Sequence, residues 1–266
     1  MARGLSIATD QTFTIAGGAL PVLPPFPRLG GTLYAAHLFG NLTARASHIL
    51  TGTAYGAGLD WSGNGRHMSS FGDRGGSIGD YGLPAAVTSE EPMSSFSLAD
   101  LWTAGSGAFS LVCLANCPAA AKTVSLIRSD SAVSSPYAAL TIAPTSADAR
   151  AQATVTTATT AQIGTLTGEL GAVALYAGTY TSAARNVFSR VGVASTKTAT
   201  ETTALGSITG SQHFEFADEA GSGTGTGTTT VYAAAFYSKA LSQMEFETIH
   251  DRLKAFYAAI GSGLTI

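Results

Sequence analysis

Short segments that alternate apolar and polar residues recur along this chain, with turn-forming residues between them. In one of them, Phe109, Leu111 and Cys113 fall on one face at a period of two. The segments of this style are 31–40, 108–114, 123–127, 137–143, 149–156, 172–180, 186–193, 213–216 and 231–237. This spacing, with Gly, Ser and Asp between the segments, predicts an antiparallel β-sandwich.

Composition excludes several classes of protein. Only 12% of the 266 residues are charged, the net charge is −3 and 45% are hydrophobic. The chain is too apolar for disorder, and it has no basic excess for a nucleic-acid partner. The chain has no run of about 18 apolar residues, so no membrane span is predicted. Residues 1–4 are followed by a polar stretch, which lacks the apolar core of a signal peptide. Its length suits one large all-β domain or two small ones.

The C-terminal region predicts the only helix that we expect. Ser242 and Glu245 have the spacing of a capping box. An apolar stripe follows at steps of three and four residues and consists of Phe246, Ile249, Leu253, Phe256 and Ile260. With Gly261 as the stop, we expect a helix of about 18 residues that packs on a sheet or on a neighbouring subunit, with His250 solvated or at an interface.

The N-terminal region differs from the rest. Residues 1–27 contain Gly17–Gly18 and a proline run from Pro21 to Pro27, which favours an extended path. We expect an arm over 1–27, or alternatively a first strand of the main domain, and a folded body over 28–266. The Gly- and Thr-rich segment 221–230 predicts an exposed loop.

The two cysteines, Cys113 and Cys117, have three residues between them, unlike a redox Cys-x-x-Cys pair. A zinc site needs a second pair of Cys or His ligands nearby, and the sequence has none there, so we predict no zinc site. On a strand they would lie roughly 13 Å apart, too far for a disulfide. We expect two small buried hydrophobic residues.

The order of these features resembles the concanavalin A-like lectin/glucanase (laminin-G-like) jelly roll of bacteriophage and prophage structural proteins. The residues that carry the resemblance are the Ser-Gly-Asn-Gly of 62–65 and, near the C-terminus, Tyr237, Lys239, Ala240, Leu241, Ser242 and Glu245. It covers roughly residues 30–260 and implies an all-β antiparallel jelly-roll sandwich with an extended N-terminal arm and one C-terminal α-helix.

The sequence departs from this family where the family holds calcium or catalyses hydrolysis. The strand before the Ala-Leu-Ser signature reads Val231–Ala234 and carries no carboxylate, so calcium is not supported and we expect neither cofactor nor metal. The family's glucanases carry a row of three acidic residues. The nearest candidate here is Glu215, Asp218 and Glu219, with Ala217 where the middle aspartate belongs, and we interpret it as a turn with surface carboxylates. We therefore expect no catalytic residues, with a glycoside hydrolase as the remaining enzymatic alternative.

A lectin site needs an aromatic surface and polar groups that fix sugar hydroxyls. The candidates for carbohydrate binding, all from a turn-rich stretch, are Asp60, Trp61, Asn64, Arg66, Asp80 and Tyr81. The alternative is that Trp61 caps the core while Gly63 and Gly65 make a tight turn. We expect Trp102 in the core.

The resemblance implies a non-enzymatic bacteriophage virion protein of the tail, baseplate or head, made in the host cytoplasm. Its partners would be other virion proteins through the arm, further copies of itself in a homo-oligomer such as a trimer, and a host-surface glycan. Two alternatives stay open: a purely architectural capsid decoration or tail subunit, and a bacterial cytosolic lectin-like protein without a virion role.

Overall fold

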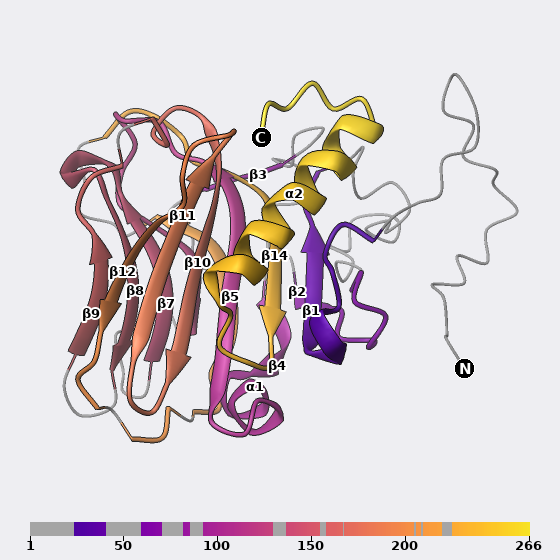
Figure 1. The fold of residues 1–266 in the computed structure, drawn as a ribbon, viewed down its shortest axis with the longest axis vertical. Coiled ribbons are helices and arrows are strands. Elements are labelled where there is room, and N and C mark those ends of the chain that lie inside the picture. The colour runs from indigo at the N-terminus through magenta and orange to yellow at the C-terminus, as the bar shows by residue number, and fades with distance from the viewer. Residues whose placement is uncertain are drawn as a thin grey trace, which may run out of the picture.

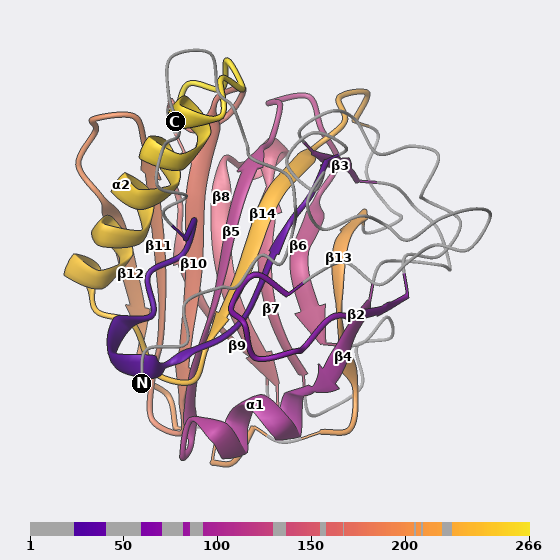
Figure 2. The same cartoon turned by 90° about the vertical axis from the view of Figure 1, so that its right-hand side faces the viewer.

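The computed structural model describes residues 24–40, 60–70, 82–85, 93–129, 137–154, 158–166, 168–204, 206–208, 210–219 and 225–266. Two antiparallel sheets form a sandwich, and the C-terminal helix covers one of them (Figures 1 and 2). The predicted all-β antiparallel sandwich with a C-terminal helix is therefore confirmed.

The sheet beneath the helix is called sheet 1. Its strand order is β1 (Leu33–Leu38), β14 (Thr230–Tyr237), β5 (Ala108–Asn116), β10 (Val173–Thr181), β11 (Arg185–Val191) and β12 (Lys197–Glu201), with β3 (Leu83–Pro84) also paired to β14. β5 lies between β14 and β10, and all nine of its residues pair with β10. Its predicted alternation is confirmed, because Phe109, Leu111 and Cys113 all enter the core between the sheets.

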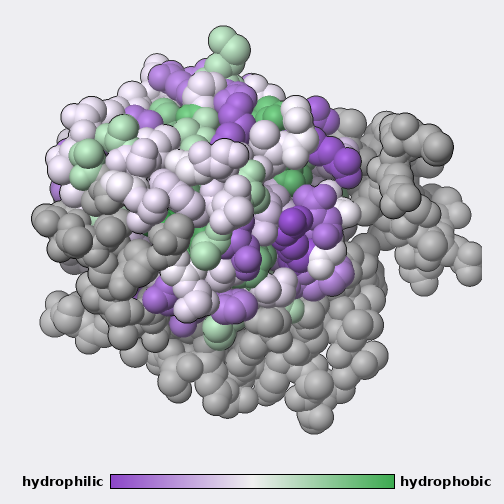
Figure 3. Space-filling model, turned by 90° about the horizontal axis from the view of Figure 1, so that it is seen from below, coloured by the Kyte–Doolittle hydropathy of each residue, from purple (hydrophilic) through white to green (hydrophobic). Residues whose placement is uncertain are grey.

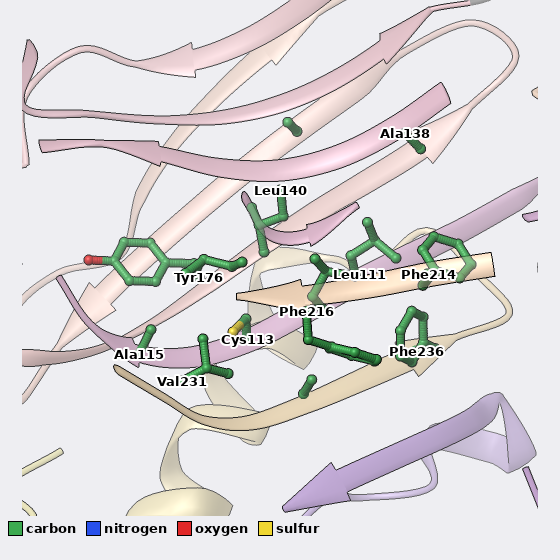
Figure 4. Close-up of a cluster of buried hydrophobic side chains, with 14 of the residues drawn as sticks. Leu111, Cys113, Ala115, Ala138, Leu140, Tyr176, Phe214, Phe216, Val231 and Phe236 are labelled. Atoms are coloured by element: carbon green, nitrogen blue, oxygen red, sulfur yellow. The ribbon is translucent and has the colours of Figure 1, made fainter. Parts of the chain in front are cut away.

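The second sheet, called sheet 2, lies on the far side of that core. Its order is β2 (Met68–Ser70), β4 (Met93–Ser97), β13 (His213–Glu219), β6 (Val124–Ser129), β7 (Tyr137–Ala143), β8 (Asp148–Thr154) and β9 (Ala158–Ile163). Figure 4 shows the core between the sheets, where Phe236 and Tyr176 from sheet 1 approach Phe214, Phe216 and Leu140 from sheet 2.

Helix α2 (Gln243–Ala259) begins at the predicted capping box: Ser242 Oγ accepts a bond from Glu245 N, and the Glu245 carboxylate accepts one from Ser242 N. The apolar stripe packs on the outward face of sheet 1 and forms a second core there (Figure 1). His250 is buried, which corrects the expectation of a solvated side chain. The helix thus packs on the sheet of its own chain.

A second helix, α1 (Leu98–Ala104), was not predicted from the sequence; it has its own capping box between Ser97 and Asp100. Leu98, Leu101 and Trp102 enter the core between the sheets, so α1 closes one end of the sandwich. Trp102 lies in the core, as predicted. Among the described residues neither helix has the length and apolarity to span a bilayer.

The folded body begins before Arg28. Phe26, which the sequence placed in the arm, is buried in the core beneath α2, and the Pro27 carbonyl accepts a hydrogen bond of 3.1 Å from Tyr237 Oη. The predicted arm up to residue 23 lies outside the described residues, as do residues 221–224 of the predicted loop.

Cys113 and Cys117 are both free and buried, as predicted. Burial raises the pKa of the Cys117 thiol to about 12, so it stays protonated at neutral pH. On the described surface that Figure 3 shows from below, hydrophobic residues form small separate areas among polar ones. The homo-oligomer stays a prediction.

Candidate functional site

Four of the predicted carbohydrate-binding residues lie in one loop, residues 60–67, which we call the edge loop. It runs beside β1 at the edge of sheet 1 and leads into β2 at the edge of sheet 2. The other two, Asp80 and Tyr81, lie outside the described residues. The edge loop therefore joins the two sheets along one side of the sandwich.

Asp60 organises the edge loop from within. Its Oδ1 accepts hydrogen bonds from the backbone N–H groups of Ala36 at 3.0 Å and Ser62 at 2.9 Å. Its Oδ2 accepts bonds from Ser62 Oγ at 2.7 Å and from the backbone N–H of Arg66 at 2.9 Å. The residue is only 3% exposed. Both carboxylate oxygens are therefore used to hold the turn, which leaves Asp60 as a positioning residue.

The other edge-loop side chains bind mainly to β1. Asn64 Nδ2 donates to the carbonyls of Leu33 and Tyr34 at 2.8 and 3.0 Å, and Arg66 Nη1 donates to the Tyr34 carbonyl at 3.2 Å. The Arg66 guanidinium also lies 3.7 Å above the Tyr34 ring, a cation–π contact. Trp61 is half-buried against the core beneath α2. These contacts cover the exposed edge of β1, a structural task that sheet edges require.

The acidic segment 215–219 is not a turn, which corrects the sequence interpretation. It belongs to β13, which pairs with β6 and β4 inside sheet 2. Ala217 has a positive φ of 58°. Phe216 and Ala217 both enter the core, so the regular alternation of the strand is interrupted between them. As a result, Glu215 and Asp218 lie together on the outward face of sheet 2, where regular alternation would have placed them on opposite faces.

Arg128 on β6 lies between these two carboxylates. Arg128 is directly opposite Glu215 in the strand register, and its Nε donates to Glu215 Oε2 at 3.1 Å. Its Nη1 pairs with Asp218 Oδ2. The three side chains are 15%, 14% and 7% exposed, in the order Arg128, Glu215 and Asp218. We call this largely buried group the carboxylate–arginine triad.

The outward face continues across the neighbouring strands with polar groups and one aromatic ring. Tyr137 on β7 places its hydroxyl 3.5 Å from Gln152 Oε1 on β8, and burial raises the pKa of this tyrosine. Further along, Asp148 accepts bonds from Arg150 at 2.7 Å and from Gln162 at 3.0 Å. No described helix or strand covers this face of sheet 2. The triad, Tyr137 and Gln152 form what we call the sheet-2 face.

Sequence reasoning found the two carboxylates but missed Arg128 and Tyr137. The available signal was the alternation Phe214–Glu215–Phe216, which marks Glu215 as outward-facing. The pairing of β13 with β6 brings Arg128 to this position, and a single sequence does not state that pairing.

The described residues contain no cluster of three His, Cys, Asp or Glu side chains that could hold a metal ion. The described histidines are engaged separately. His67 Nδ1 accepts a bond of 3.1 Å from the Asp60 backbone, and His213 Nδ1 lies 2.8 Å from the Ser94 carbonyl.

Comparisons with solved structures show the same type of sandwich at low sequence identity. The binding domain of botulinum neurotoxin serotype D has a TM-score of 0.57 and 9% identity, over 83% of this chain and 51% of that chain. The receptor binding domain of botulinum neurotoxin C/D mosaic serotype has a TM-score of 0.54 and 10% identity, over 83% and 51%. Trypanosoma rangeli sialidase in complex with sialic acid has a TM-score of 0.50 and 14% identity, over 90% and 34%.

The chain thus spans about half the length of these neurotoxin domains, and the likeness shows the fold alone. No protein-family model and no curated protein matches the sequence.

Proposed function

We propose that the protein binds carbohydrate on the sheet-2 face and performs no chemistry on it. The carboxylate–arginine triad beside Tyr137 is the observation that carries the proposal. It gathers hydrogen-bonding groups of both kinds next to an aromatic ring, on strands of a rigid sheet. The receptor-binding domains among the similar structures support a recognition role for this type of sandwich.

The sheet-2 face has the properties that sugar recognition requires. Sugar hydroxyls both donate and accept, so they can donate to the carboxylate oxygens of Glu215 and Asp218 without displacing Arg128. The apolar edge or face of a tyrosine ring can pack against the C–H groups of a sugar ring. Because the triad is already ordered by its own ion pairs, sugar binding would cost little side-chain entropy.

The same geometry opposes catalysis. Most glycosidases use one carboxylic acid as a proton donor and a second carboxylate as nucleophile or base. Here Glu215 and Asp218 both accept from the single guanidinium of Arg128, which gives them the same role. The sialidase among the similar structures shares the fold at 14% identity, which carries no catalytic residue to this chain.

The experiment is a binding assay against a panel of bacterial surface polysaccharides and storage glucans, by affinity electrophoresis and titration calorimetry. Tyr137→Ala should weaken binding about tenfold, the cost of removing an interface aromatic worth about 1.4 kcal/mol. Trp61→Ala in the edge loop is the matched aromatic control. No reducing sugar should be released.

Three outcomes distinguish a glycan site on the sheet-2 face, a glycan site on the edge loop and a protein that binds no glycan. Loss in Tyr137→Ala alone supports the sheet-2 face. Loss in Trp61→Ala alone moves the site to the edge loop, with Asn64 and Arg66 as its polar contacts. If the native protein binds no glycan of the panel, the proposal fails and the architectural reading remains.

We also propose that this binding serves a bacteriophage virion, in which the protein is a tail, baseplate or head-attached component. The support is the resemblance of the sequence, whose Tyr237–Glu245 stretch forms the connection from β14 into α2. Detecting the protein in purified particles, and labelling it there with an antibody, tests this role directly.

A further inference from the structure

We propose that the sheet-2 face selects non-acidic glycans over sugars that carry carboxylate or phosphate groups, because its own carboxylates neutralise Arg128. This inference rests on the proposed function and names the ligand class of the same site. Glu215 and Asp218 are its specificity-determining residues.

The first argument is charge balance. The described ionisable side chains of the triad and of strand β8, which β7 separates from β6, are Arg128, Arg150, Glu215, Asp218 and Asp148. Two positive and three negative groups give a local net charge of −1. An anionic sugar would therefore approach a surface of its own sign.

The second argument is that both arginines are already paired. A site for an acidic sugar typically presents an arginine whose N–H groups can bind the carboxylate of the ligand in a bidentate manner. Arg128 instead directs Nε and Nη1 at Glu215 and Asp218, and Arg150 Nη2 lies 2.7 Å from Asp148 Oδ2. An incoming carboxylate would have to compete with carboxylates that the fold holds in place.

The third argument is burial. Water screens charges weakly where side chains are largely buried. The one negative charge that Arg128 leaves uncompensated between two carboxylates therefore repels an anionic ligand even at ordinary salt. The side chains of Glu215 and Asp218 are only 14% and 7% exposed. A hydroxyl group, by contrast, can donate to these carboxylates without introducing charge, so a sugar without acidic groups fits the face.

The test uses two groups of glycans with the full-length protein. Laminarin, dextran and galactomannan represent neutral glycans, and polygalacturonate and polysialic acid represent acidic ones. The native protein should bind at least one neutral glycan and no acidic one. The double variant Glu215→Gln/Asp218→Asn leaves Arg128 without its carboxylate partners and should gain affinity for acidic glycans by about tenfold, equivalent to about 1.4 kcal/mol.

Glu219→Gln is the matched control, because Glu219 lies on the same strand and pairs with Lys122 at 3.5 Å, away from Arg128. This control should leave the preference unchanged. Circular dichroism and a thermal melt show whether the double variant folds. If it does not fold, the native protein's preference between the two groups still decides the inference.

Binding of acidic glycans by the native protein would overturn the inference and leave the proposed function standing. A folded double variant without any gain toward acidic glycans would also overturn it. If the native protein binds no glycan of either group, the proposed function itself fails.

Discussion

A single residue with an unusual backbone decides the chemistry of the sheet-2 face. Ala217 has a φ of 58°, in the left-handed region, where an L-residue costs roughly 1–2 kcal/mol. On the adjacent strand, Leu126 and Ile127 likewise both enter the core. The two irregularities lie side by side, so Arg128 and Asp218 face outward together. Backbone strain of this kind is often kept where it positions functional groups.

This strain predicts effects of different size for two substitutions. Ala217→Gly relieves the strain but removes a buried methyl worth about 0.8 kcal/mol, so urea unfolding should show a change close to zero. Ala217→Val adds a branched side chain at a positive φ inside the core and should lower the free energy of unfolding by about 2–3 kcal/mol.

Ala199→Val is the control, because Ala199 lies on the edge strand β12 and is not among the positive-φ residues. It should change stability little. Equal losses for the Val variants at positions 199 and 217 would show that the backbone at Ala217 is unstrained.

At the scale of elements, α2 converts one face of sheet 1 into a second core. Its capping box and apolar stripe were predicted from spacing alone, since both are interactions within a few residues. His250 was not predicted, because its burial depends on the surface that α2 meets. Its Nδ1 lies 3.2 Å from Asp251 Oδ1, and Asp251 in turn lies near Arg190 of β11.

The buried His250 predicts a pH-dependent stability. Burial, together with Arg190 and Lys254, lowers the pKa of this imidazole below its ordinary value, and Asp251 opposes the shift only in part. The unfolded chain therefore binds a proton more readily than the folded one. Stability should be full above about pH 6.5 and fall as the pH drops toward the lowered pKa of the folded state.

Urea titrations of the native protein and of His250→Gln between pH 7.5 and 5 measure this effect. The variant should lose less stability over that interval than the native protein. Identical pH slopes for the two proteins would refute a contribution from His250.

At the scale of the whole molecule, three layers succeed one another: α2, sheet 1 and sheet 2 (Figure 2). α2 covers sheet 1, whereas no described helix covers the outward face of sheet 2. The sheet-2 face is therefore a sheet surface that no described helix covers, and polar residues from several strands gather on it. The edge loop joins the layers at one side, with Asp60 as its centre.

Truncation separates the predicted arm from the folded body. Removing residues 1–23 keeps Phe26 in the core beneath α2 and should leave the thermal midpoint unchanged. Removing residues 1–27 also deletes Phe26 and should destabilise the body by about 3 kcal/mol, as for a lost core phenylalanine.

If the virion role holds, the protein that lacks residues 1–23 should fold but fail to join particles, as measured by its amount in purified particles. Normal incorporation of this folded protein would contradict anchoring by the arm.

By itself, the sequence determined the kind of elements and much of their burial. Alternation at a period of two predicted nine strand-like segments that match β1, β5–β8, β10, β11, β13 and β14, and the stripe with its capping box predicted α2. The short or polar strands β2, β3, β4, β9 and β12 were not predicted, because their alternation is weak.

Only the tertiary structure decided which residues meet. Asp60 became the centre of the edge loop because it accepts from Ser62 and Arg66 of that loop and also from the Ala36 N–H of β1, which fixes the loop to the sheet. Arg128, Glu215 and Asp218 meet because β6 pairs with β13 and because both strands depart from alternation at the same level. A local pattern records which face of a strand avoids water, but the identity of the neighbouring strand and its register depends on the packing of the whole sandwich.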